Sequence, residues 1–201
     1  MIKMPDTETP QAMFNFTVHP SISSFTVPSE TYLSTHPGEE FKYNFIATGA
    51  LVFDASTPER ILLIQRAAHD SMSGRWEIPG GGCDNEDPSI LHGVARELWE
   101  EAGLTAVSIG PQVGNGQFFT TRSGKLVGKF NFLVDVAKDA GGNLDVKLDR
   151  SEHQNYVWAA EEEVKARKVG GTELEFTTKD QEAVLLEAFR VRREMKSHGQ
   201  E

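Results

Sequence analysis

The stretch "ARELWEEAGL", Ala95–Leu104, is the part of the sequence on which both the fold and the candidate site depend. It has the pattern of an amphipathic helix: apolar residues recur three and four apart, and Gly103 suits the left-handed conformation that ends a helix. Residues three and four apart share one helix face. Three carboxylates are therefore expected to lie together, away from the apolar stripe of Leu91, Ala95, Leu98 and Ala102: Glu97, Glu100 and Glu101.

The helix is expected to begin near Asp87, a suitable cap, with Pro88 at the first helical position. Two interpretations of its acidic face are open. Each like-charge pair costs only about 0.2–0.5 kcal/mol in water, so a solvated acidic face is the ordinary expectation from composition alone. A divalent cation would instead turn the repulsion into attraction, because Mg²⁺ prefers clustered carboxylate oxygens and leaves coordination positions for phosphate.

Strand-like and helical segments alternate on both sides of this helix. Before it come two predicted strands, 42–54 and 60–66, and the glycine-rich loop "PGGG" at 79–82. After it come a predicted hairpin that turns at Ser123-Gly124, a strand at 155–159, a short acidic helix and a final amphipathic helix that follows Thr178. This order predicts an α/β fold of the α+β kind, with a mixed central sheet between helices.

The length of 201 residues suits one domain with tails. Residues 1–40 are rich in Pro, Ser, Thr and acidic residues, so we expect an extended N-terminal arm, frayed at its beginning. The folded domain is expected to span residues 41–196, and residues 197–201 are expected to form a tail.

Composition narrows the range of partners and locations. The formal net charge of −10 disfavours nucleic acid and anionic membranes as partners, because phosphate contacts depend on Lys and Arg. Cys83 is the only cysteine, which is compatible with a reducing compartment, and the first residues lack an apolar run typical of a signal peptide or a membrane helix. We therefore expect a cytoplasmic protein; a homodimer is compatible with the sequence.

The fixed positions of this region resemble the signature of the Nudix hydrolase superfamily. That signature reads Gly, five residues, Glu, seven residues, then Arg-Glu-apolar-x-Glu-Glu-x-Gly-apolar, and residues 96–104 match its second half at every fixed position. The looser resemblance covers about 150 residues, from "FIATGALVFD" through "RWEIPGGG" to "EHQNYVWAAEEEV". One departure is clear: counted back from Arg96, the first signature Glu falls on Pro88.

The resemblance implies a Nudix-like α/β/α sandwich and a pyrophosphohydrolase that cleaves the diphosphate linkage of a nucleoside diphosphate derivative. It also implies that Mg²⁺ or Mn²⁺ is held by Glu97, Glu100 and Glu101 with a backbone carbonyl of Gly81 or Gly82. Arg96 would orient a glutamate through a charge-assisted hydrogen bond. The partner would be a small nucleotide.

Further site residues come from the flanking segments. The general base is either a helix glutamate or Glu152 in a later loop, and Glu152 is equally compatible with an ordinary surface position. Arg66 and Arg75 are candidates for phosphate contacts, and Phe119 is a candidate for stacking on a base, with core packing as the alternative for the aromatic residues. His153 is expected to be a polar loop residue. The Pro88 departure keeps a second hypothesis open, a non-catalytic nucleotide-binding or sensing module.

Overall fold

The computed structural model describes residues 14–36, 43–54 and 58–198. The first 13 residues of the expected arm, its boundary with the domain at residues 40–41 and most of the expected tail lie outside these ranges. The elements, in chain order, are β1 (Thr17–Val18), the 3-10 helix η2 (Pro20–Phe25), α1 (Ser29–Thr35), β2 (Phe45–Val52), β3 (Arg60–Arg66), β4 (Trp76–Glu77), α2 (Ile90–Ala102), β5 (Ala106–Thr120), β6 (Leu126–Val136), β7 (His153–Ala160), α3 (Glu161–Lys165), β8 (Lys168–Val169), β9 (Thr172–Glu173) and α4 (Asp180–His198).

The strands form two main sheets and a small hairpin. The larger sheet has the order β1-β5-β6-β2 and is mixed, because β2 runs parallel to β6 and β1 parallel to β5, whereas β5 and β6 are antiparallel. The second sheet, β4-β3-β7, is antiparallel, and β8 pairs with β9. The predicted mixed α+β architecture is therefore confirmed.

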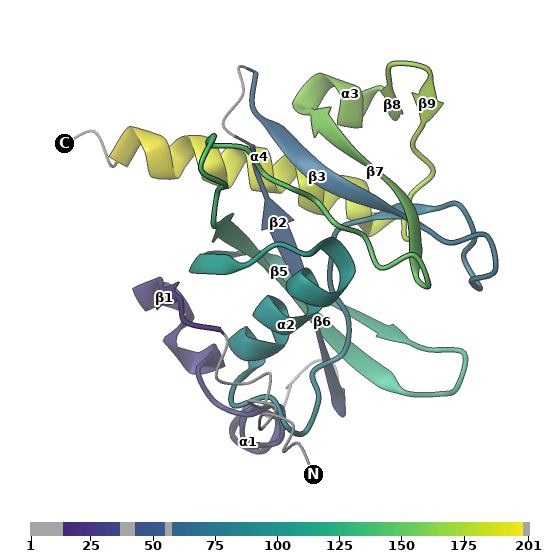
Figure 1. The fold of residues 1–201 in the computed structure, drawn as a ribbon. Helices are drawn as coiled ribbons and strands as arrows, with labels where there is room; N and C mark the ends of the chain where they lie inside the picture. The colour runs from purple at the N-terminus through teal and green to yellow at the C-terminus, as the bar shows by residue number, and fades with distance from the viewer. Residues whose placement is uncertain (1–13, 37–42, 55–57, 199–201) are drawn as a thin grey trace, which may run out of the picture.

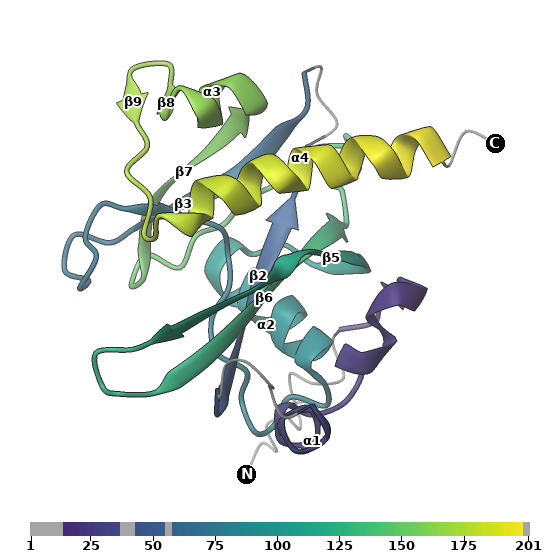
Figure 2. The ribbon, with the colours of Figure 1, turned by 180° about the vertical axis from the view of Figure 1, so that it is seen from behind.

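Helices α2 and α4 lie on opposite sides of the strands (Figures 1 and 2). Successive side chains of a strand point to opposite faces, and the two buried clusters follow this alternation. Leu62 and Ile64 of β3 pack in the cluster of α2, whereas Ile61 and Leu63 pack in the cluster of α4. The strands are thus buried on both faces, which explains why β3 is a nearly continuous apolar run.

The expectation of an extended arm is wrong for residues 14–36. This segment folds into β1, η2 and α1, and it contributes apolar side chains to the cluster around α2: Phe14, Ile22, Phe25 and Tyr32. The Phe25 ring stacks on Tyr32 with centroids 4.9 Å apart and also contacts Phe130 and Phe132. Burial of these rings outweighs the extended preference of the Pro-rich sequence.

Among the described residues, none of the helices combines the length and the apolar character required to cross a membrane. Helix α4 is the longest, with 19 residues, and it carries charged side chains along its length.

Candidate metal and phosphate site

Helix α2 places its glutamates against a loop rather than in open solvent. The helix begins after Ser89, whose hydroxyl accepts the His92 N–H at 3.2 Å, and it ends at Gly103, which has φ +67°. The predicted stripe of Leu91, Ala95, Leu98 and Ala102 is fully buried, which fixes the rotation of the helix. As a result Glu101 is buried and the Glu97 side chain is only 14% exposed, whereas Glu100 is exposed. A fully solvated acidic face is therefore excluded.

The covering loop is "PGGG". The backbone N–H of Gly80 donates to Glu101 Oε2 at 2.6 Å. Gly81 passes so close to Glu97 that a Cβ atom there would lie 2.6 Å from a carboxylate oxygen, so a larger residue would displace that carboxylate. Burial raises the pKa of Glu97, and it raises the pKa of Glu101 well above its ordinary value. The loop thus holds two carboxylates where their negative charge is unfavourable without a cation.

The resemblance implies a carbonyl ligand from Gly81 or Gly82, and both carbonyls already accept a hydrogen bond. The Gly81 carbonyl accepts the Thr48 N–H at 2.8 Å, and the Gly82 carbonyl accepts an Arg96 N–H at 2.9 Å. A carbonyl oxygen has two lone pairs, so each of these bonds leaves one for another partner. The Gly81 backbone passes against the Glu97 carboxylate, and a Gly81 carbonyl ligand stays a prediction.

Arg96 ties the helix glutamates to the loop. Its Nη1 donates to Glu97 and to Glu100, each at 2.9 Å, which is the orienting contact that the sequence predicts. Its Nε and Nη2 donate to the two oxygens of Asp87 at 3.0 and 2.9 Å. The guanidinium therefore stands at the centre of an acidic cluster and fixes the direction of two carboxylates.

Asp87 is a site residue that the sequence reasoning missed. We expected it to cap the helix, but Ser89 is the cap, and Asp87 is buried against Arg96. Asp87 follows Gly81 by six positions, the spacing of Gly and Glu in the signature, so counting forward from Gly81 would have found it. The extra residue lies between Asp87 and Arg96. Pro88 therefore marks a shift of one position rather than the loss of the acidic residue.

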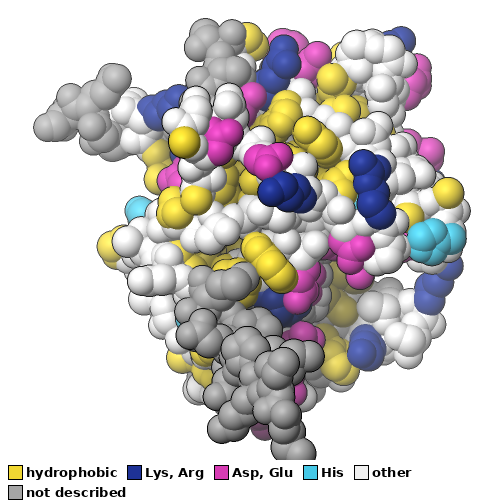
Figure 3. All heavy atoms as spheres, viewed as in Figure 1, with side chains coloured by type: hydrophobic (Ala, Val, Ile, Leu, Met, Phe, Trp, Pro, Cys, Tyr) yellow, Lys and Arg dark blue, Asp and Glu magenta, His cyan; other side chains and the backbone are white. Residues whose placement is uncertain are grey.

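Glu152 joins the helix glutamates around one cavity of about 350 Å³. The cavity is lined by Arg66, Gly80, Gly81, Gly82, Glu97, Glu100, Glu101, Asp149 and Glu152. Glu101, Glu152 and His153 each offer a ligand atom, and these atoms lie within 4.8 Å of one another. Figure 3 shows acidic side chains beside a hollow near the middle of this face. Carboxylate oxygens dominate the donor set, which suits Mg²⁺ or Mn²⁺.

His153 is not the polar loop residue that we expected. It is the first residue of β7 and is 1% exposed. Its Nε2 lies 3.3 Å from Glu77 Oε1 and 3.9 Å from Glu101 Oε1. Burial acts to raise the pKa of Glu77, but the His153 hydrogen bond and the charges of Arg66 and Lys129 outweigh it, and the pKa is lowered. Glu77, also missed from the sequence, therefore stays ionised behind the site.

The three predicted substrate-binding residues have different positions. Arg66 lines the acidic cavity, where it is bound to Glu77 at 2.6 Å and to Asp70 at 2.5 Å. Phe119 lines a larger adjoining cavity of about 1,030 Å³, together with Arg66 and the glycine loop.

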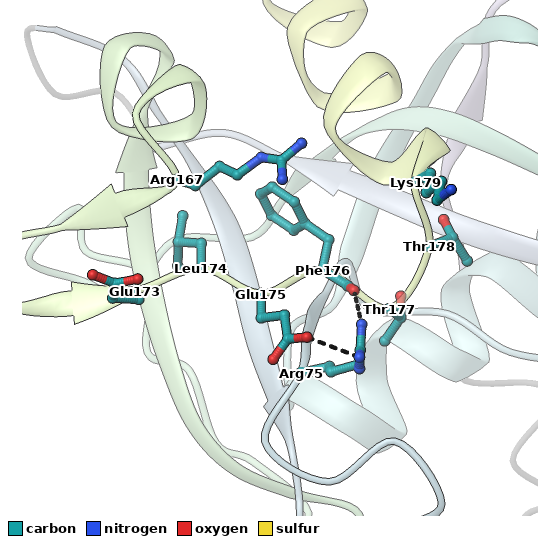
Figure 4. Close-up of a pocket in the computed structure, with 9 residues that line it drawn as sticks. All are labelled: Arg75, Arg167, Glu173, Leu174, Glu175, Phe176, Thr177, Thr178 and Lys179. Atoms are coloured by element: carbon teal, nitrogen blue, oxygen red, sulfur yellow. Dashed lines mark hydrogen bonds and ion pairs between the residues drawn. The ribbon is translucent and has the colours of Figure 1, made fainter.

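Arg75 does not reach either cavity. It lines a separate cavity of about 520 Å³ with residues from the β9–α4 connection (Figure 4). Its guanidinium donates to the Phe176 carbonyl at 2.9 Å and pairs with Glu175 at 2.8 Å, and these contacts hold it there. A role for Arg75 in the same site as the helix glutamates is therefore not supported.

Cys83 follows the glycine loop, but burial raises the pKa of its thiol to about 12. A thiol of this kind is a poor nucleophile at neutral pH, because the thiolate is the reactive form. The acidic residues thus remain the candidates for chemistry.

Comparison with known proteins agrees with this fold. The family model of the NUDIX domain matches residues 44–179, so the chain belongs to the NUDIX family. It is 34% identical over 109 residues to a MutT-like protein of Streptomyces ambofaciens, a match that covers 54% of this chain and 60% of that protein. It is also 34% identical over 84 residues to the bovine (Bos taurus) m7GpppN-mRNA hydrolase NUDT17, covering 41% of this chain and 26% of that protein. These segments thus span less than two thirds of the curated relatives.

Solved structures show the same fold. The MutT protein from Methanosarcina mazei Go1 is similar with a TM-score of 0.56 and 29% identity, over 76% of this chain and 96% of that one. The NUDIX domain of Shewanella oneidensis NrtR, solved with ADP ribose, is similar with a TM-score of 0.54 at 19% identity, over 83% of this chain and 99% of that one. The second likeness concerns the fold alone.

Proposed function

We propose that the protein is a Mg²⁺-dependent (or Mn²⁺-dependent) pyrophosphohydrolase that cleaves the diphosphate linkage of a nucleoside diphosphate derivative. The observation that carries this proposal is the convergence of Glu97, Glu101 and Glu152 on one cavity beneath the glycine loop. Burial raises the pKa values of Glu97 and Glu101, so a cation beside them is favourable, and a divalent ion supplies that charge and can also bind a diphosphate. We also propose that the protein acts in the cytoplasm.

The residues have distinct roles in this proposal. Glu97, Glu100 and Glu101 hold the cation with the Gly81 carbonyl. When bound, the cation polarises the phosphoryl oxygens and lowers the pKa of water. Arg96 keeps Glu97 and Glu100 aimed at the cavity, and Asp87 keeps Arg96 in place. Gly80 fixes one oxygen of Glu101.

Glu152 is our candidate for the general base. It is exposed, lines the cavity opposite the helix, and has a carboxylate oxygen within 4.8 Å of one of Glu101. A base must reach the attacking water directly or through one other water, and this position allows it. Arg66 already donates to Asp70 and Glu77. Its role is therefore to keep these two carboxylates in place and to add positive electrostatic potential to the cavity.

The names of the relatives do not fix the substrate. NUDT17 is named as a hydrolase of m7GpppN-mRNA, and a Psychrobacter relative, 44% identical over 50 residues, as an RNA pyrophosphohydrolase. Both act on phosphoric anhydrides by name. The acidic balance of this chain favours a small nucleotide over RNA. The alternative of a non-catalytic module rested on Pro88, and the Asp87–Arg96 pair supports the hydrolase instead, because an acidic side chain still binds Arg96.

A substrate panel tests the proposal. The protein is incubated with Mg²⁺ and nucleotide sugars, dinucleotides, ADP-ribose, coenzyme derivatives and nucleoside triphosphates, and the products are separated by anion-exchange chromatography. We expect cleavage between phosphates of at least one compound. Glu101→Gln, which keeps the shape of the side chain, should reduce turnover by about 100-fold or more, whereas Glu173→Gln, on the exposed β9, should leave it unchanged.

Two outcomes would contradict the proposal. Equal turnover by the wild type and by Glu101→Gln would exclude the metal role of that carboxylate. Tight binding of a panel member without cleavage by the wild type would favour a binding module instead.

A further inference from the structure

The cavity of about 520 Å³ that Arg75 lines is separate from the metal site, and the two share none of the described residues. It lies between the α3–β8–β9 segment, the loop before β4 and the connection from β9 to α4 (Figure 4). We call it the arginine cavity. Five of its seven polar side chains can donate hydrogen bonds, in contrast to the carboxylates over α2. These five are Arg75, Arg167, Thr177, Thr178 and Lys179.

Arg75 is held at this cavity in a fixed orientation. Its Nη1 donates to the Phe176 carbonyl at 2.9 Å, and its Nη2 lies 2.8 Å from Glu175 Oε1. A guanidinium carries five N–H donors, so within the described structure three of them remain for a ligand. If Arg75 contacts a phosphate, as the sequence predicts, that phosphate lies in the arginine cavity.

Arg167 reaches the cavity from an unusual backbone conformation. Its φ is +52°, and it is the only described residue other than glycine with a positive φ. It follows the end of α3, a position where glycine is favoured because a Cβ atom is unfavourable in this conformation. Figure 4 shows its guanidinium beside the Phe176 ring. An arginine at a position that favours glycine indicates a role for its guanidinium.

The Arg167 guanidinium is also held in place. Its Nε and Nη2 donate to Glu182 of α4 at 2.8 and 2.5 Å. Its Nη1 has no partner among the described residues, so two N–H donors stay available to a ligand.

Lys179 adds a positive charge that no carboxylate neutralises. Across the ranges 14–36, 43–54 and 58–198, its ammonium has no ion pair within 4.0 Å. The hydroxyl groups of its neighbours Thr177 and Thr178 likewise make no hydrogen bond within these ranges. The donors of all three side chains are therefore available to a ligand.

The two carboxylates of the cavity do not cancel this charge. Glu175 is paired with Arg75, and Glu173 is 85% exposed and lies 3.9 Å from the ammonium of Lys168. In Figure 4, Glu173 lies at the opposite end of the cavity from Lys179. Free donors therefore gather at the Lys179 end.

We propose that the arginine cavity is a second ligand site and that it binds a phosphomonoester. Such a group carries about −1.5 to −2 charges at pH 7 and three strong acceptor oxygens, which match two guanidinium groups, an ammonium and two hydroxyls. The buried side chains of Leu174 and Phe176 line the same cavity and offer apolar contact to the organic part of the ligand. Cleavage of a nucleoside diphosphate derivative between its phosphates leaves phosphomonoesters, so the products of the proposed reaction belong to this ligand class.

Nuclear magnetic resonance tests this site without metal or turnover. The ¹⁵N-labelled protein is titrated in EDTA, at constant ionic strength, with phenyl phosphate and separately with benzoate. We expect saturable shifts of the amide signals of Thr177, Thr178 and Lys179 with phenyl phosphate. Benzoate has one charge and two oxygens, so it should bind about tenfold more weakly or worse, the effect of losing one hydrogen bond to a charged group.

Two variants and two matched controls locate the site. Lys179→Gln and Arg167→Gly should each weaken phenyl phosphate binding about tenfold. Arg167→Gly also supplies the residue that a positive φ favours, so its unfolding temperature should not fall. Lys165→Gln and Arg190→Gln remove the same charge from α3 and α4 outside the cavity, and both should bind like the wild type.

The inference is overturned if the amide signals of residues 177–179 show no saturable shift. It is also overturned if Lys179→Gln binds phenyl phosphate as tightly as Lys165→Gln, or if benzoate binds as tightly as phenyl phosphate. Because the titration contains neither a divalent metal nor a diphosphate, its result is independent of whether the protein hydrolyses any panel compound.

Discussion

Helices α2 and α4 carry similar charge patterns, yet the structure uses them differently. In α4, Arg190 pairs with Glu187 and Glu194, and these side chains are 36% to 54% exposed. In α2, Arg96 pairs with Glu97, one residue away, and with Glu100, four residues away, but it is 15% exposed and also binds buried Asp87. The difference comes from the loop "PGGG", which covers α2 and has no counterpart over these residues of α4 within the described structure.

This comparison shows what separates a functional acidic cluster from an ordinary helix surface. Sequence spacing alone places carboxylates on one face in both helices. Only in α2 does a backbone segment desolvate them, so that their pKa values rise and a cation becomes favourable. In α4 the pKa of Glu187 is lowered by its hydrogen bond with Arg190, as is usual for a surface ion pair.

The largest expected difference concerns the two arginines. Arg96→Ala leaves buried Asp87 without its partner, and removal of one member of a buried pair costs about 3–5 kcal/mol of unfolding free energy. Arg190→Ala removes only exposed pairs and should leave stability unchanged. Urea unfolding followed by circular dichroism measures both. Equal losses in the two variants would show that Arg96 is an ordinary surface residue.

A smaller effect, on turnover, is expected to distinguish substitutions of two adjacent glycines. A Cβ atom at Gly81 would lie 2.6 Å from the Glu97 carboxylate, whereas a Cβ atom at Gly82 would meet nothing within 4 Å. Gly81→Ala should therefore displace Glu97 and reduce turnover about tenfold or more, while Gly82→Ala stays close to the wild type. Turnover of the best panel substrate is the measurement. Similar activity of the two variants would mean that the loop does not position Glu97.

The smallest effect is expected at Cys83. Because burial raises the pKa of its thiol to about 12, a thiol-specific reagent such as 5,5′-dithiobis(2-nitrobenzoate) should react slowly at pH 8, and Cys83→Ser should keep full turnover. Fast labelling of Cys83, together with loss of turnover in Cys83→Ser, would contradict this prediction and indicate a catalytic role for the thiol.

The predicted elements that were confirmed have strong local signals. Helix α2 has apolar residues at helical spacing and a terminal glycine, and β3 is a continuous apolar run. These local sequence patterns identify both elements without knowledge of tertiary contacts. The fold of residues 14–36 could not be seen, because Pro and Ser obscure the local pattern and the aromatic residues gain their stability from distant strands.

The site residues also divide into those with a local sequence signal and those that depend on distant contacts. The helix glutamates and Arg96 were visible because their spacing within one helix is rigid. Asp87 has a spacing signal, six positions after Gly81. In contrast, Glu77 and His153 approach the helix glutamates only through tertiary packing, and Arg75 turns away because its partners Glu175 and Phe176 lie 100 residues or more along the chain. Sequence spacing does not report such contacts.

Metal binding tests the central claim most directly: that the covered carboxylates of α2 hold a divalent cation. Mn²⁺ is titrated into the protein and free Mn²⁺ is followed by electron paramagnetic resonance, with the double variant Glu97→Gln/Glu101→Gln and the α4 control Glu187→Gln. We predict that the wild type and the control bind Mn²⁺ with equal affinity and that the double variant binds it at least tenfold more weakly. Equal binding by all three proteins, or no binding by the wild type, would contradict the claim.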